Sequence, residues 1–139
     1  MKRVYVVTIC SALAVLLVAF GLHKIVFGEE IEGTIKVGFV YVGDASTAYT
    51  YNFMKAQFAI ETEYGESAEV IAKYNVAEGY EKTALQELVD AGCELIFTTS
   101  YGYGEQTKEF ARLHPEVQFC QATCSNANQE PVLNNYHNF

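Results

Sequence analysis

A regular alternation of apolar runs and amphipathic segments constrains the fold of this chain most. Apolar runs at residues 35–42, 68–74, 95–99 and 117–122 predict strands, and the intervening segments 47–64, 77–91 and 105–113 predict helices. The run at 35–42 is nearly continuous, which is typical of a strand covered on both faces. This order predicts an α/β fold, a flavodoxin-like lobe with a parallel sheet and helices on both faces. We expect the first and third strands to be neighbours, with a binding crevice at their junction.

Two of the predicted helices carry stripes of apolar residues at helical spacing. The first stripe is Phe53, Ala56, Ile60 and Tyr64. The second runs from Tyr80 through Ala84, Leu85, Leu88 and Val89 and stops at Gly92. We expect both stripes to face the sheet, and we expect no regular structure in the polar, asparagine-rich tail after residue 122.

Two tyrosine-rich loops are the predicted ligand site. Residues 43–52 follow the first strand and residues 100–105 follow the third, so both loops meet at the carboxyl edge of the sheet. Tyrosine rings stack on flat ligands and their hydroxyls form hydrogen bonds. The candidates here are Tyr49, Tyr51, Tyr101 and Tyr103. An equally acceptable reading of Tyr49 is that it packs under the first helix, four residues before Phe53.

Other residues of these loops have a second interpretation as well. Gly102 lets the backbone approach a ligand and leaves an amide free at the start of a helix. Asp44 is a candidate acceptor for ligand hydroxyls, or alternatively a residue that caps the following helix or forms a turn before it.

The N-terminal segment predicts export. Lys2 and Arg3 precede an apolar run over residues 4–22, so residues 1–28 have the pattern of a signal peptide or an uncleaved signal anchor. Residues 29–139 then provide at most one domain. We expect this domain at the outer face of the cell membrane, anchored or secreted.

Charge and motifs argue against several classes of function. Residues 29–139 hold all 17 acids and six of the nine bases, and such an acidic domain is not expected to bind nucleic acid. No zinc-ligand spacing and no nucleophile elbow is present, so we expect no metal, no cofactor and no enzymatic activity. Cys93 and Cys120 fit buried core positions. The sequence leaves a disulfide between Cys120 and Cys124 as an alternative.

Five segments in this order resemble a known family. They are residues 36–44, the pair Tyr49 and Tyr51, and residues 95–103, 111–119 and 135–139. Together they are similar to the basic membrane protein (Med or PnrA-like) family of ABC-transporter solute-binding proteins. The resemblance implies a type I periplasmic-binding fold of two lobes that closes on a ligand, commonly a purine nucleoside, and delivers it to a membrane permease.

The resemblance also assigns roles to individual residues. Tyr49 matches the aromatic residue that stacks on the base, and Thr50 stands where the family often has asparagine. Tyr101, Gly102 and Tyr103 match an aromatic-Gly-aromatic motif, and Glu105 stands where aspartate is common. The family is roughly twice as long as this chain, so the resemblance indicates a truncated N-terminal lobe that binds ligand weakly by itself.

The function expected from the sequence is therefore the extracytoplasmic substrate-binding component of an ABC importer, for purine nucleosides or a similar ring-shaped solute. The alternative is a membrane-anchored ligand-sensing or interaction domain on the same fold. An uncleaved N-terminus favours this alternative, and a trimmed one favours the receptor.

Overall fold

A computed structural model describes residues 33–139. The predicted signal or anchor at residues 1–28 lies outside the described residues. Among the residues described, no helix has the length and apolar character needed to cross a membrane.

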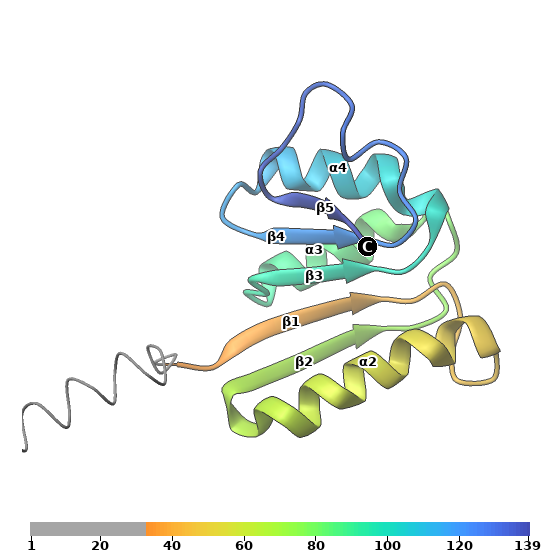
Figure 1. The fold of residues 1–139 in the computed structure, drawn as a ribbon, viewed down its shortest axis with the longest axis vertical. Coiled ribbons are helices and arrows are strands. Elements are labelled where there is room, and N and C mark those ends of the chain that lie inside the picture. The colour runs from red at the N-terminus through yellow and green to blue at the C-terminus, as the bar shows by residue number, and fades with distance from the viewer. Residues whose placement is uncertain (1–32) are drawn as a thin grey trace, which may run out of the picture. The chain divides into compact units, whose positions relative to one another are not determined.

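The predicted parallel α/β sheet is confirmed. Its strands are β1 (Ile35–Val40), β2 (Ala68–Lys73), β3 (Leu95–Thr98), β4 (Gln118–Gln121) and β5 (Tyr136–Asn138). They lie in the order β2-β1-β3-β4-β5, and every neighbouring pair is parallel (Figure 1). The first and third strands are neighbours, as predicted. All carboxyl ends therefore lie along one edge, on the right of Figure 1.

Helices pack against both faces of the sheet. The helices are α2 (Ala48–Tyr64), α3 (Glu81–Asp90) and α4 (Gly104–Leu113). Leucines of α3 and Phe110 of α4 form one core with Val40, Ile96 and Phe119. On the opposite face, Met54 of α2 packs with Val37 and Phe39. The strands therefore bury side chains on both faces, which explains the apolar character of β1.

The predicted stripe on α2 is only partly correct. Phe53 and Ile60 pack against the core, but Ala56 and Tyr64 are exposed. The residues of α2 that are buried are instead Met54 and the polar residues Thr50 and Gln57. Gln57 is tolerated there because its Oε1 accepts a hydrogen bond from the buried Tyr41 hydroxyl at 3.0 Å.

Helix α3 begins later than predicted. It starts at Glu81 rather than near residue 77, because residues 77–80 form a turn in which Gly79 has a φ of +87°. Glu81 Oε2 accepts a hydrogen bond from the Gly79 amide at 2.7 Å. Tyr80 consequently lies outside the helix and is strongly exposed instead of joining the core stripe.

The polar tail contains a strand that was not predicted. β5 pairs with β4, and the buried Tyr136 packs into the same core as Phe119. Asn135 holds this segment in place: its Nδ2 donates to the carbonyls of Ala111, His114 and Val117 at 2.9–3.0 Å. These bonds join the end of α4 to the start of β4.

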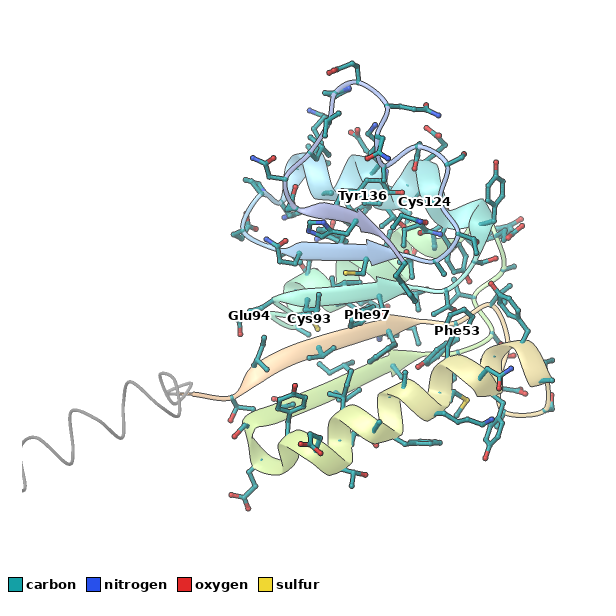
Figure 2. All side chains as sticks on the ribbon, viewed as in Figure 1. Phe53, Cys93, Glu94, Phe97, Cys124 and Tyr136 are labelled. Atoms are coloured by element: carbon teal, nitrogen blue, oxygen red, sulfur yellow. The ribbon has the colours of Figure 1, made fainter. Side chains whose placement is uncertain are left out.

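Aromatic side chains gather beside β5 on the face that carries α2. Phe39 stacks on Phe97 with ring centroids 5.0 Å apart, and Phe139 meets both Phe97 and Phe53 edge-on. Phe53 and Phe97 are labelled in Figure 2. These ring contacts connect α2 and β3 to Phe139, the residue that follows β5.

Candidate functional site

Loops from four strands meet at the carboxyl edge of the sheet. The two predicted tyrosine loops follow β1 and β3, and the structure adds residues 74–80 after β2 and residues 122–126 after β4. The amide of Asn75 donates to the carbonyl of Gly43 at 3.1 Å, which fixes the β2 loop against the β1 loop. The candidate site is therefore built from four loops rather than two.

Two of the four candidate tyrosines, Tyr49 and Tyr101, are exposed in these loops, at 48% and 64% of their surface. The Tyr49 hydroxyl donates to the carbonyl of Thr99 at 2.8 Å, and its ring meets Phe53 edge-on. The Tyr101 hydroxyl lies 3.4 Å from Ser125 Oγ. Tyr49 thus packs against Phe53 of its own helix, and about half of its surface stays exposed; contact with a ligand remains a prediction.

The other two candidate tyrosines lie elsewhere. Tyr51 is exposed on α2, where Lys55 Nζ lies 5.2 Å from its ring centroid. Tyr103 is fully buried in the core, and its hydroxyl donates to the carbonyl of Val76. Burial raises the pKa of the Tyr103 phenol. Its ring has no exposed face for stacking, so the structure gives Tyr103 a role in the core instead of the predicted ligand contact.

Thr50 also turns inward. It is fully buried in the first turn of α2, and its Oγ1 has no hydrogen-bond partner among the described residues. Its hydroxyl would lie 3.1 Å from a Cβ on Gly43, so a side chain at position 43 would crowd Thr50. The structure therefore places Thr50 under the loop and away from the exposed surface.

Asp44 takes the turn role that was considered for it. Its Oδ1 accepts a hydrogen bond from the amide of Ser46 at 2.9 Å, and its Oδ2 accepts one from Asn75 Nδ2 at 3.2 Å. Hydrogen bonds from Ser46, followed by the one from Asn75, hold the pKa of the Asp44 carboxyl below its usual range. Both oxygens already have partners, so Asp44 organises the loop.

Glu78 is a polar residue of the site that the sequence analysis missed. It extends from the β2 loop to the β3 loop, where its Oε1 accepts hydrogen bonds from Ser100 Oγ and from the Gly102 amide, the latter at 3.0 Å. These bonds hold the pKa of the Glu78 carboxyl below its usual range. A Cβ on Gly102 would lie 2.3 Å from Glu78 Cδ. Glycine at 102 is therefore needed for this carboxylate to sit on the backbone.

A small cavity of about 180 Å³ lies between the β3 and β4 loops, next to Tyr101. Gly102, Glu105, Cys124, Ser125 and Asn126 line it. Glu105, one of the predicted site residues, is part of the cavity wall. Its Oε1 accepts a hydrogen bond from Asn126 Nδ2 at 3.2 Å. Cys124, one of these lining residues, is labelled in Figure 2.

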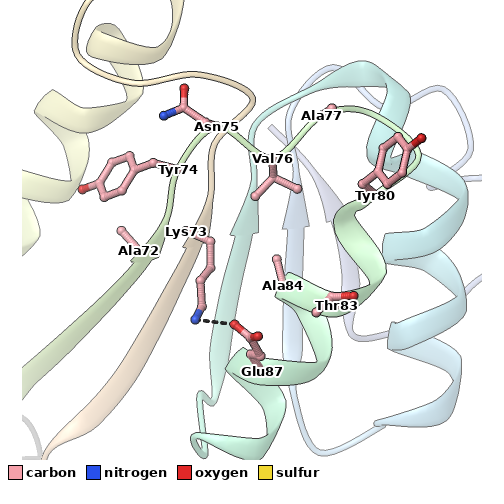
Figure 3. A pocket seen from close by; sticks show the side chains of 10 residues that line it. All are labelled: Ala72, Lys73, Tyr74, Asn75, Val76, Ala77, Tyr80, Thr83, Ala84 and Glu87. Atoms are coloured by element: carbon pink, nitrogen blue, oxygen red, sulfur yellow. Dashed lines mark hydrogen bonds and ion pairs between the residues drawn. The ribbon is translucent and has the colours of Figure 1, made fainter.

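A second, shallower hollow lies on the other side of the β2 loop. It is lined by Tyr74, Asn75, Val76, Tyr80 and residues of α3, and the ion pair between Lys73 Nζ and Glu87 Oε2 (2.6 Å) crosses its wall (Figure 3). It is wide open to solvent and shares no lining residue with the cavity beside Tyr101. We therefore treat it as separate from the candidate site.

Metal ligands and disulfides do not mark this site. Within residues 33–139, no group of three or more His, Cys, Asp or Glu side chains is arranged to hold a metal ion. Cys93, Cys120 and Cys124 are free thiols, so the Cys120–Cys124 disulfide is not formed. Burial raises the pKa of both the Cys93 and the Cys120 thiol. Cys93 is a core residue as predicted, whereas Cys120 is only half-buried.

Comparisons with known proteins were made for the whole chain. No model of a known protein family matches it. A purine-binding protein of Brucella abortus (strain 2308) is 36% identical over 94 residues, which cover 66% of this chain and 27% of that protein. The chain thus spans about a quarter of the length of this curated relative.

Solved structures share the fold. A solute-binding protein of an ABC transporter system from Conexibacter woesei DSM 14684 superposes with a TM-score of 0.63 at 15% identity, covering 76% of this chain and 34% of that one. An ABC-transporter solute-binding protein from Aeropyrum pernix K1 gives 0.56 at 16% identity, covering 75% and 28%. These findings confirm the predicted resemblance to solute-binding proteins, which the chain matches over part of their length. The three relatives are each named as binding proteins.

Proposed function

We propose that this chain, which resembles the N-terminal portion of basic membrane protein-type solute-binding proteins, supplies a ligand-binding lobe of an ABC importer. The ligand we propose is a purine nucleoside or a similar ring-shaped solute. One observation carries the proposal: the exposed ring of Tyr49 is hydrogen-bonded through its hydroxyl to Thr99, two residues before the exposed ring of Tyr101, at the carboxyl edge of a parallel sheet. The name of the Brucella relative, a purine-binding protein, supports the same ligand class.

The geometry favours stacking as the source of affinity. Tyr49 is held by its hydrogen bond to Thr99 and by Phe53, so little conformational entropy is lost when a base packs on it. Stacking of a base on an aromatic side chain contributes about 1–3 kcal/mol in nucleic-acid-binding proteins. Tyr101 adds a second ring, and the cavity beside it has room for part of a small solute.

The described residues provide one wall of such a site. Binding proteins that enclose a ligand bury most of its surface, and most of their affinity depends on that enclosure. We therefore expect the chain itself to bind a purine nucleoside in about the millimolar range, close to 4 kcal/mol of binding free energy.

Substitution of Tyr101 tests the proposal. Titration of the protein with inosine, followed by amide chemical shifts in NMR, should give an affinity that Tyr101→Ala lowers by about tenfold, as expected for the loss of one stacking contact. Tyr101→Phe keeps the ring and should bind almost as the wild type does. The matched control is Tyr64→Ala, because Tyr64 is an exposed tyrosine at the far end of α2. Equal binding by the Tyr101→Ala and Tyr64→Ala variants would contradict the proposal.

Transport and location belong to the same proposal. An importer component acts outside the cytoplasm and delivers its solute to a membrane permease, and the basic and then apolar pattern of residues 2–22 supports export. Copurification of a permease with the protein from its native membrane tests the partner. N-terminal sequencing of the same sample tests whether residues 1–28 are removed.

A further inference from the structure

Glu78 is a charged residue of the candidate site, and the stacking proposed for the tyrosines gives it no role. It lies in the exposed β2 loop, yet its carboxylate is held on the neighbouring β3 loop by the Gly102 amide and by Ser100 Oγ. Both bonds use Oε1. Among the described residues, no donor reaches the second oxygen, Oε2.

The carboxylate that carries this oxygen lies against the β3 loop. A Cβ on Gly102 would lie 2.5 Å from Glu78 Oε2, so the carboxylate rests directly on the Gly102 backbone. The same short segment carries Thr99, which accepts the hydrogen bond from Tyr49, and Tyr101 with its exposed ring. Glu78 also lies close enough to Tyr49 to raise the pKa of that phenol, after the larger effect of burial.

A carboxylate that is held in this way differs from an ordinary surface acid. Most exposed glutamates lose side-chain entropy when they bind a ligand, whereas Glu78 is already immobilised by two hydrogen bonds. An ionised carboxylate accepts hydrogen bonds only, so its free oxygen distinguishes donors from acceptors on a ligand. Hydrogen bonds to a charged group are also the stronger ones.

From this arrangement we infer that Glu78 contacts the ligand in the proposed site: Oε2 accepts a hydrogen bond from an N–H or O–H group at the rim of the stacked ring compound. This inference rests on the proposed function. It narrows the ligand class to ring solutes with a donor beside the stacking face, and the donor belongs either to the base or to an attached sugar.

Glu78→Gln is the informative variant, because it preserves shape. The amide oxygen can still accept from Ser100 and Gly102, which leaves the amide nitrogen, a donor, where Oε2 was. Gly102→Ala acts on the same contact without altering Glu78, since the added methyl displaces the end of a flexible side chain. Glu63→Gln is the matched control, an exposed acid near the end of α2.

The experiment is an NMR titration of the protein and these variants with inosine, hypoxanthine and 1-methylinosine. Inosine has donors on both base and ribose, hypoxanthine lacks the ribose, and 1-methylinosine lacks the base N1–H. We expect Glu78→Gln to weaken inosine binding by about tenfold, the effect of one charge-assisted hydrogen bond. The loss should be absent for the one probe that lacks the contacting donor. Gly102→Ala should reproduce this pattern, and Glu63→Gln should bind like the wild type.

Two results would overturn the inference while leaving the proposed function in place. One is wild-type affinity of the Glu78→Gln variant for all three probes. The other is an equal loss for all three, because a purely structural role would weaken every ligand alike. A wild-type protein whose amide shifts respond to none of the probes would refute the proposed function, and the role of Glu78 with it.

Discussion

Replacement of Asn135 by alanine should destabilise the fold strongly, although Asn135 lies in a tail that has the composition of a loop. The side chain is buried, and its Nδ2 donates to the carbonyls of Ala111, His114 and Val117. Two of these carbonyls belong to the end of α4 and the turn that follows, and the third lies just before β4. The side-chain amide therefore satisfies carbonyls at the end of α4, as a C-cap does, and in the turn that follows the helix.

The expected magnitude follows from the number of hydrogens. One amide group supplies two N–H donors to three acceptors, so about two hydrogen bonds are lost, each with a net value near 1 kcal/mol. Carbonyls that stay buried without a donor add to the cost. We expect a loss of about 2–3 kcal/mol in the free energy of unfolding, which for a domain of this size lowers the melting temperature by about 10 °C.

Urea denaturation followed by circular dichroism measures this loss as a lower midpoint at an unchanged m-value. Asn134→Ala is the control, since Asn134 is the exposed neighbour. Asn135→Asp separates hydrogen bonding from packing: it keeps the shape but turns acceptor oxygens toward three carbonyls, and it should destabilise at least as much as alanine does. An aspartate variant more stable than the alanine variant, or an Asn135→Ala variant as stable as Asn134→Ala, would refute this reasoning.

Two further substitutions test the assignment of loop and strand residues to the core. Tyr103→Phe removes only the hydroxyl that donates to Val76, and it should lower the free energy of unfolding by about 1 kcal/mol in urea denaturation while leaving the ligand-induced amide shifts intact. A loss of ligand binding in that variant would contradict this assignment and indicate that Tyr103 contacts the ligand. Gly38→Ala should cost about 1–3 kcal/mol in the same assay, because the new Cβ would lie 2.9 Å from Leu88 Cδ1 in the core; an unchanged midpoint would contradict this packing.

The strand order and the helices of this fold could be predicted because their signals are local. Apolar runs of strand length alternate with helical stripes, and the right-handed crossover restricts the arrangements that remain. β5 was missed because it is three residues long and polar on either side of its single core residue, Tyr136. What makes it a strand is its pairing with β4 and the anchor at Asn135, and neither contact is visible in local sequence.

The two tyrosine loops lie at the carboxyl edge of the sheet as predicted, but the directions of their side chains could not be predicted. The position of Tyr49 and Tyr101 followed from the loops in which they stand, whereas the inward direction of Tyr103 depends on the short 3-10 turn Tyr101–Tyr103. Glu78 was missed because only the loops after the first and third strands were assigned to the site, and its role comes from a contact across 24 residues of sequence. The Glu-Gly pair at 78–79, a tight turn at a strand's carboxyl end, was the one local signal.

The most direct test of the central claim is a measurement of intermolecular nuclear Overhauser effects between a bound purine nucleoside and the tyrosine rings. Stacking at the carboxyl edge predicts contacts from the H2 and H8 protons of the base to the ring protons of Tyr101 and Tyr49. Effects confined to Tyr74 and Tyr80, which line the separate hollow, would place the ligand elsewhere and contradict the claim. So would the absence of any such effect at nucleoside concentrations of several times the expected millimolar dissociation constant.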